Sequence, residues 1–175
     1  MYKALFLDRD GIINIDHGYT YKIENFEFTK DLFKLLKLFR EKNYLFFIVT
    51  NQSGIGRGYY TQEDYNTLTE WMITTFHQKG IDIEKVYHCA HAPEENCQCR
   101  KPEIGMMTQC LRDYNIDLMH SWMIGDKQSD IDFARHSHVR HTIAIGERKI
   151  ENAEYHFESI SECTYYLEEN QGKIL

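Results

Sequence analysis

Two carboxylates at the end of a short apolar run are the residues of this sequence best placed to do chemistry. The apolar run at residues 4–7 is followed by Asp8 and, two residues later, by Asp10. Such a run is typical of a buried parallel strand, and open α/β sheets bind ligands where their strands end. Both carboxylates would face one side, where they need a cation, a shared proton or strong donors. One interpretation is a Mg²⁺ site in which one aspartate is also a nucleophile, and the alternative is a solvated acidic turn.

Other polar groups stand at the ends of later apolar runs. Thr50 ends one run, Asp126 follows another, and Lys101 comes just before a helical pattern. In a doubly wound sheet the strand ends meet along one edge, which would bring these groups to Asp8 and Asp10. Carboxylates can hold a divalent metal there, while hydroxyl and ammonium groups can hold phosphate oxygens. Together these residue types suit phosphoryl transfer.

The elements that must position these groups alternate between strand and helix, which predicts a mainly parallel, Rossmann-like sheet with crossover helices. The expected helices cover residues 31–42, 61–79, 107–114, 129–135 and a C-terminal segment that begins after Ser159; the further strands cover residues 44–49, 86–89, 122–124, 142–145 and 155–157. The segment 51–58 is too rich in glycine for a regular element. We expect one domain, residues 1–175.

Composition restricts the partners of the chain. It is 42% hydrophobic and 27% charged, which fits a globular domain with an ordinary core. Its net charge of −7 argues against non-specific binding to nucleic acid. No apolar stretch approaches the roughly 18 residues that span a bilayer, and no signal-peptide pattern opens the sequence. We expect a cytoplasmic monomer that acts on a small phosphorylated metabolite, without nucleic-acid or membrane partners.

Three cysteines and a histidine cluster in the middle of the chain: Cys89, His91, Cys97 and Cys99. This set suits a tetrahedral zinc ion, and four protein ligands leave no position for a reactive water, so the zinc should be structural. It would fix the loop directly before Arg100 and Lys101. The alternative is a group of free thiols that cluster by chance. Cys110 and Cys163 fall on apolar helix faces and are expected in the core.

The order and spacing of these motifs resemble those of the haloacid dehalogenase-like phosphatases. The motifs are Asp8-Arg9-Asp10-Gly11, Thr50, Lys101, and Gly125-Asp126 with Asp130 four residues later. The segments 16–19, 50–58 and 97–102 narrow the resemblance to the D-glycero-D-manno-heptose 1,7-bisphosphate 7-phosphatases, which serve lipopolysaccharide precursor synthesis, with the histidinol-phosphate phosphatases close by. The resemblance covers nearly the whole chain. The short segment between Asp10 and Thr50 leaves no room for a large cap domain.

The resemblance implies a mechanism with a covalent intermediate. Asp8 would attack phosphorus and form an aspartyl-phosphate. Asp10 would protonate the departing sugar oxygen and then deprotonate the attacking water. Asp8, the backbone carbonyl of Asp10 and Asp126 would hold Mg²⁺, which offsets repulsion between nucleophile and substrate. Thr50 and Lys101 would hold the remaining phosphate oxygens.

The resemblance also implies a sugar-phosphate pocket lined by Asp16, His17, Gly18, Tyr19, Thr50, Asn51, Gln52, Ser53, Arg100, Lys101 and Lys127. Arg57 is a candidate contact for the phosphate that is not cleaved. The glycines of segment 51–58 would let backbone amides approach an anion, the alternative being a flexible connection. Asp130 is expected to support the site from behind. We interpret His17 as pocket lining, and His136, His138 and His141 as surface residues and not a second metal site.

Two features of the sequence disagree about the substrate. Only five residues separate His91 from Cys97, a short zinc loop that favours a histidinol-phosphate phosphatase. The segments expected to contact substrate, 16–19 and 51–58, favour a heptose bisphosphate. We give the contacting segments more weight, because specificity comes from groups that the wrong substrate leaves unpaired. A third hypothesis, a catalytically silent zinc-stabilised binding module, is disfavoured because the acidic and lysine motifs are intact.

Overall fold

A six-stranded parallel sheet is the centre of the computed structural model, which describes residues 1–175, the side chain of Gln171 excepted. The strands are β1 Ala4–Leu7, β2 Leu45–Asn51, β3 Ile83–Cys89, β4 Trp122–Gly125, β5 His141–Ile145 and β6 Tyr155–Phe157. Their order is β3-β2-β1-β4-β5-β6, and every pairing is parallel. The chain therefore reverses its direction of growth between β1 and β4, the point at which open α/β sheets bind ligands.

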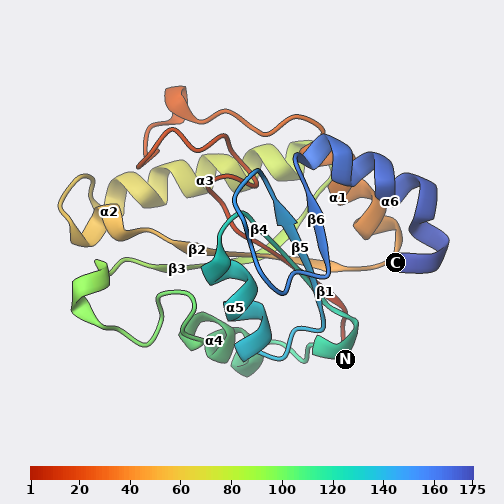
Figure 1. Ribbon diagram of the computed structural model, residues 1–175. Helices are drawn as coiled ribbons and strands as arrows, with labels where there is room; N and C mark the ends of the chain where they lie inside the picture. The colour runs from red at the N-terminus through yellow and green to blue at the C-terminus, as the bar shows by residue number, and fades with distance from the viewer.

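Helices cover both faces of this sheet (Figure 1). They are α1 Leu32–Glu41, α2 Ser53–Gly56, α3 Gln62–Gln78, α4 Gly105–Asp113, α5 Gln128–His136 and α6 Ile160–Ile174. Helices α1, α3 and α6 lie on one face, and α4 and α5 lie on the other. This arrangement confirms the predicted doubly wound, mainly parallel fold.

The central strand β1 is buried from both sides. Because side chains alternate along a strand, Leu5 and Leu7 enter the core beneath α1, α3 and α6, whereas Ala4 and Phe6 enter the core beneath α4 and α5. All four side chains are fully buried. The continuous apolar run that predicted a buried parallel strand is thus required by helices on both faces.

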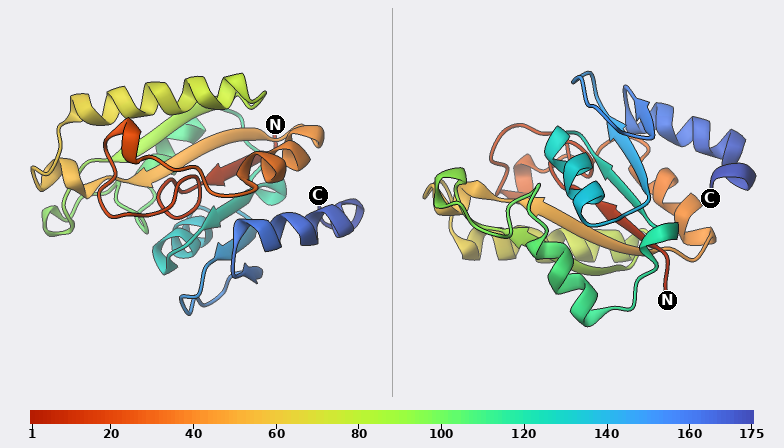
Figure 2. Two further views of the ribbon diagram at one scale, coloured as in Figure 1. Left: turned by 90° about the horizontal axis from the view of Figure 1, so that it is seen from above. Right: turned by 60° about the horizontal axis from the view of Figure 1, so that its bottom comes forward.

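The segment between β1 and β2 contains a loop and α1. The loop includes a 3-10 turn at Ile23–Asn25 and packs on α3, where Phe26 and Phe28 contact Trp71 at ring-centroid distances of 5.6 and 5.9 Å. Figure 2 shows the same loop beside α3 at the end of the sheet. No large cap domain is inserted in this segment, as predicted.

Two local predictions were wrong. Segment 51–58 contains the helical turn α2, which is stabilised from outside because the backbone N–H groups of Gln52 and Gly56 donate to carbonyls of Cys89 and Ala90 at 2.7 and 2.8 Å. Strand β3 begins at Ile83, three residues before the expected start, because it pairs with Phe46 of β2.

The remaining helix signals behave as the sequence indicates. Thr61 caps α3 by a reciprocal capping box with Asp64: the Thr61 hydroxyl accepts from the Asp64 N–H at 3.1 Å, and the Asp64 carboxylate accepts from the Thr61 N–H at 2.8 Å. Cys110 and Cys163 are fully buried, as expected. Within residues 1–175, no helix has both the length and the apolar character needed to cross a bilayer.

Candidate active site

Three carboxylates meet at the carboxyl edge of the sheet. Asp8 directly follows β1, Asp126 directly follows β4, and Asp130 lies in the first turn of α5. One oxygen from each lies within 4.8 Å of the other two, and all three residues are buried. The end of β1 is tied to β4 because the Asp8 N–H donates to the carbonyl of Ile124 at 3.1 Å. Buried carboxylates this close require positive charge.

Lys101 supplies part of that charge. Its Nζ atom lies 2.9 Å from Asp8 Oδ1, 2.6 Å from Asp130 Oδ1 and 2.7 Å from the carbonyl of Val49, so all three ammonium protons have acceptors. Burial alone would lower the pKa of Lys101, but Asp130 and Asp8 outweigh it and raise that pKa. Lys101 therefore stays charged inside the protein.

Asp130 connects this lysine to the turn after β4. Its Oδ2 atom accepts from the backbone N–H groups of Asp126 and Lys127, both at 3.0 Å. A side chain at Gly125 would collide with Asp130, so the close approach of β4 to α5 requires glycine there. The side chain of Asp130 thus binds both the ammonium group of Lys101 and the backbone of the turn that carries Asp126.

The pair Asp8 and Asp126 is incompletely neutralised. Burial and the nearby Asp130 raise the pKa of Asp8, against the influence of Lys101. Burial and Asp8 raise the pKa of Asp126 to about 6, against the influence of Lys127 and Arg148. Carboxylate oxygens are the ligands that Mg²⁺ prefers, and a divalent cation would relieve this repulsion. The donor set therefore fits a magnesium ion.

Gly11 leaves the space that this acidic pair needs. Its φ is +94°, a left-handed conformation that favours glycine, and a Cβ atom there would lie 2.4 Å from Asp126 Oδ2. Any other residue would be strained and would displace the carboxylate. The glycine of the first motif is thus explained by its close approach to Asp126 of the fourth motif.

The side chain of Asp10 has separate partners. Arg9 Nη2 and Asn14 Nδ2 each donate to Oδ1 at 3.0 Å, and Gln52 Nε2 donates to Oδ2 at 3.0 Å. Burial would raise the pKa of Asp10, but the Arg9 guanidinium and these hydrogen bonds outweigh it and hold the pKa below its usual value. Asp10 is therefore a charged, oriented acceptor, and it is its backbone carbonyl that we expected to contact the metal.

A cavity of about 320 Å³ opens beside Asp10. It is lined by Asp10, Asp16, Gly18, Tyr19, Asn51, Gln52, Ser53, Tyr60, Arg100, Lys127 and Ser129. Most of the predicted pocket residues line this cavity, while Thr50 and Lys101 are buried. Tyr60 and Ser129 were not predicted, because neither stands at a strand end or in a glycine-rich turn.

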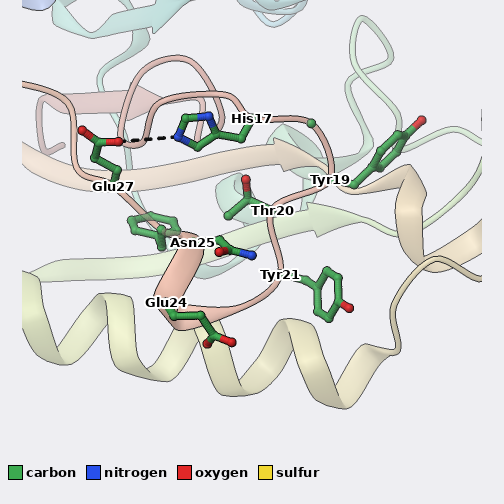
Figure 3. A pocket seen from close by; sticks show the side chains of 9 residues that line it. His17, Tyr19, Thr20, Tyr21, Glu24, Asn25 and Glu27 are labelled. Carbon is green, nitrogen blue, oxygen red and sulfur yellow. Dashed lines mark ion pairs between the residues drawn. The ribbon is translucent and has the colours of Figure 1, made fainter.

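His17 and Arg57 lie elsewhere. The Nε2 atom of His17 is 3.5 Å from Glu27 Oε2, and its ring lines a neighbouring cavity of about 470 Å³ within the 17–27 loop (Figure 3). Glu24 and Asn25 line the same cavity, which contains neither Asp8 nor Asp126. The Nη2 atom of Arg57 is 3.9 Å from Glu94 Oε1. The cavity beside Asp10 differs from the one within the 17–27 loop because it is lined by Lys127, which contacts Asp126.

Two cationic side chains, Arg100 and Lys127, line the cavity beside Asp10, and a third, Arg148, contacts Asp126. The Nη1 atom of Arg100 is buried and has no hydrogen-bond partner among the described residues, which suits an anionic ligand. The Nζ atom of Lys127 lies 3.5 Å from Asp126 Oδ1 and 3.8 Å from Asp16 Oδ2. Arg148, which sequence patterns did not single out, donates to Asp126 Oδ2 at 2.6 Å and to the Asp126 carbonyl at 3.1 Å.

The four residues of the cysteine-rich loop converge as predicted. The Sγ atom of Cys99 lies 2.9 Å from that of Cys89 and 3.6 Å from that of Cys97, and His91 Nδ1 lies 3.2 Å from Cys99 Sγ. All five cysteines are free thiols. Three sulfurs and one imidazole nitrogen, all within 4.8 Å, fit tetrahedral zinc.

The loop that follows is joined to β2. The side chain of Asn51 pairs with the backbone of Lys101: its Oδ1 accepts from the N–H at 2.9 Å, and its Nδ2 donates to the carbonyl at 3.2 Å. A metal bound by Cys99 would fix the chain before Arg100, and the hydrogen bonds from Asn51 to Lys101 fix it after Arg100.

The histidines near the C-terminal end of α5 do not form a site in the part of the chain that the structure describes. His136 Nδ1 is 3.3 Å from the carbonyl of Pro102, whereas His141 Nδ1 is 2.8 Å from Glu154 Oε2 and its ring stacks on Trp122. Neither they nor His138 belong to a metal-ligand group there. His136 and His138 are exposed, whereas His141 is half-buried between Trp122 and Glu154.

Comparison with known proteins agrees with this geometry. A HAD-hydrolase-like family model matches residues 98–148. A D-glycero-alpha-D-manno-heptose-1,7-bisphosphate 7-phosphatase from Campylobacter jejuni is 43% identical over 95% of this chain and 96% of its own length. A D-glycero-beta-D-manno-heptose-1,7-bisphosphate 7-phosphatase from Helicobacter pylori is 46% identical over 82% of this chain and 83% of its own length.

The fold is shared with a solved structure. A D,D-heptose 1,7-bisphosphate phosphatase from B. bronchiseptica, crystallised with magnesium and phosphate, matches with a TM-score of 0.81 and 22% identity, over 95% of this chain and 98% of that one. The level of identity to the Campylobacter and Helicobacter proteins, over most of both chains, establishes the family. The chain belongs to the HAD-like D-glycero-D-manno-heptose-1,7-bisphosphate 7-phosphatases.

Proposed function

We propose that this chain is a Mg²⁺-dependent phosphatase that removes the 7-phosphate of D-glycero-D-manno-heptose 1,7-bisphosphate. The observation that carries the proposal is the buried Asp8, paired with Lys101 and next to Asp126, two residues before Asp10, which lines a cavity together with the cationic Arg100 and Lys127. This arrangement combines a nucleophile, a cation site and an anion-binding entrance. The named relatives, which are phosphatases of this class, support the same activity.

In the first step Asp8 forms a bond to phosphorus while the bond between phosphorus and the sugar oxygen breaks. Lys101 binds Oδ1 of Asp8, which leaves Oδ2 for the attack. Asp8, the backbone carbonyl of Asp10 and Asp126 would hold Mg²⁺, whose charge offsets repulsion between the anionic nucleophile and substrate. Thr50 and Lys101 would bind the phosphate oxygens that do not react, and Lys101 would exchange one of its three present acceptors for the phosphate.

Asp10 transfers the protons. An incoming phosphate places negative charge beside Asp10, which raises its pKa and favours the protonated form that donates to the leaving sugar oxygen. The resulting carboxylate then accepts a proton from water as that water attacks phosphorus and releases Asp8. Arg9, Asn14 and Gln52 favour this ionised form and fix its orientation.

The sugar and its second phosphate occupy the cavity beyond Asp10. Asp16 and Asn51 can pair with sugar hydroxyls, while Arg100 and Lys127 can pair with the 1-phosphate. A structural zinc ion bound by Cys89, His91, Cys97 and Cys99 would hold Arg100 in place. Histidinol phosphate has no second phosphate for these cations, so the heptose bisphosphate is favoured despite the short zinc loop.

The test is a comparison of kcat/KM for heptose 1,7-bisphosphate and histidinol phosphate, each with Mg²⁺ and with chelator. Phosphorus NMR of the product identifies which phosphate has left. We expect Mg²⁺-dependent release of the 7-phosphate and at least tenfold preference for the heptose. A tenfold preference for histidinol phosphate would overturn the substrate assignment. Failure to hydrolyse either compound would overturn the proposed activity.

A further inference from the structure

We propose that Tyr60 is a positioning residue of this phosphatase, which orients the acid–base residue Asp10 through the side-chain amide of Gln52. The proposal rests on the acid–base role of Asp10 proposed above. Tyr60 lines the cavity beside Asp10 but belongs to none of the sequence motifs that indicated the site. Its hydroxyl is connected to Asp10 by two consecutive hydrogen bonds.

The connection passes through the side-chain amide of Gln52, in which every donor and the carbonyl acceptor have a hydrogen-bond partner. The Tyr60 hydroxyl donates to Gln52 Oε1, and Gln52 Nε2 donates to Asp10 Oδ2 at 3.0 Å and to Thr50 Oγ1 at 2.8 Å. A glutamine amide offers two donor hydrogens and one carbonyl acceptor, and here each of them has a partner. Gln52 is only 2% exposed, so water cannot readily replace a lost partner.

The direction of these bonds follows from chemistry. An ionised carboxylate only accepts hydrogen bonds, so the amide nitrogen of Gln52 must face Asp10. The amide oxygen then points toward Tyr60, whose hydroxyl must donate. Burial raises the pKa of Tyr60 to about 12, so this donor stays protonated in neutral solution. Tyr60 thereby excludes the rotated amide, in which oxygen would face the Asp10 carboxylate.

Tyr60 is itself held by packing. Its ring stacks on that of Tyr21 with 5.2 Å between centroids and 10° between planes. A side chain at Gly54 would overlap the Tyr60 ring, so this glycine of the 51–58 segment makes room for a tyrosine. The hydroxyl is therefore fixed by contacts on two sides, and it in turn fixes Gln52.

Removal of the hydroxyl should weaken acid catalysis selectively. In Tyr60→Phe the buried carbonyl of Gln52 loses its donor, which is unfavourable, so the amide rotates or shifts and Asp10 loses a partner. A sugar oxygen needs a proton to depart, whereas p-nitrophenolate departs without one. We expect kcat/KM for the heptose bisphosphate to fall about tenfold, and kcat/KM for p-nitrophenyl phosphate to stay within about twofold.

Two further variants make the test specific. Tyr59→Phe, at an adjacent and 55% exposed tyrosine, should leave both values unchanged. Gln52→Met removes the amide but keeps the length of the side chain, and it should reproduce the selective loss. If Tyr60 acts only through Gln52, the double variant should be no slower than Gln52→Met alone.

Three results would overturn the proposal: an equal loss on both substrates, no loss on the heptose bisphosphate, or a full additional loss in the double variant. If Tyr60→Phe does not fold, the leaving-group pattern of Gln52→Met decides the question alone. Asp10→Asn separates this inference from the proposed function. Unchanged heptose turnover in Asp10→Asn would refute the acid–base role itself, while an inactive Asp10→Asn with a silent Tyr60→Phe refutes only the role of Tyr60.

Discussion

Lys101 and Asp130 form a buried ion pair, with 2.6 Å between Nζ and Oδ1 and with at most 2% of either side chain exposed. The pair joins the loop after the cysteine cluster to the first turn of α5. Since Lys101 also binds Asp8, and Asp130 also binds the backbone before α5, this one contact links three motifs that are far apart in sequence. The position of Asp8 therefore depends on Asp130, which itself needs no contact with the substrate.

Replacement of Asp130 by alanine should therefore reduce both stability and turnover. Lys101 would keep a buried charge with one carboxylate fewer, and breaking a buried pair in this way costs about 3–5 kcal/mol of the free energy of unfolding. Urea denaturation of Asp130→Ala measures the loss. Asp113→Ala, which breaks the exposed pair with Lys85, is the matched control and should change little. Equal effects of the two variants would contradict the assigned role of Asp130.

Asp8→Asn should abolish turnover while the fold is retained. The amide oxygen is a poor nucleophile, and no other described carboxylate occupies the position at the end of β1. We expect kcat to fall at least about a thousandfold, with an unchanged circular dichroism spectrum. Turnover within tenfold of the wild type would show that Asp8 does not form a covalent intermediate. Detection of a phosphorylated wild-type enzyme after rapid acid quench would directly support a covalent intermediate.

Zinc should be bound at one ion per chain by the four clustered ligands. Its removal by a thiol-reactive agent and chelator should expose the loop to proteolysis and lower activity, because Arg100 and Lys101 follow directly. Added Mg²⁺ should not restore this activity, but added Zn²⁺ should. Elemental analysis of protein purified without chelator provides the stoichiometry. Cys110→Ser, outside the cluster, should leave the zinc content unchanged, and absence of zinc from the native protein would refute the site.

Stability of the metal-free enzyme should fall as pH rises from about 4 to about 6. The folded pKa of Asp126 is raised to about 6 from an ordinary 3.8, so in this interval the folded protein holds a proton that the unfolded chain has lost. The free energy of unfolding then decreases with increasing pH. Thermal melts in chelator should show this decrease, and Mg²⁺ should reduce it. In an Asp126→Asn variant, stability should depend less steeply on pH. The same pH dependence in both proteins would show that Asp126 is not the group responsible.

The parts of the site that lie at strand ends could be predicted from the sequence. Asp8, Thr50 and Asp126 each follow or end a buried strand, and parallel pairing brings such positions together whatever the loops do. The cysteine cluster was equally clear, because its ligand types and spacing have few other uses. The sheet and the crossover helices followed from hydrophobic periodicity.

Residues placed by loops could not be predicted in the same way. Arg148 reaches Asp126 from the loop after β5, and Tyr60 reaches Gln52 from the end of a glycine-rich segment; neither lies in a periodic pattern. The helical turn α2 was missed because its stability comes from the carbonyls of Cys89 and Ala90 at the end of β3, which local sequence does not encode.

The burial of β1 from both faces has an evolutionary consequence. The proposed nucleophile, Asp8, follows a strand that is fully buried, whereas Asp16, Gly18 and Tyr19, which line the cavity, belong to the exposed loop after β1. Mutations that lengthen or reshape that loop can alter the molecule that is accepted without disturbing the bond-breaking centre. Selection can therefore act on substrate choice and on reactivity almost independently, and new specificities can arise in this scaffold from changes confined to its periphery.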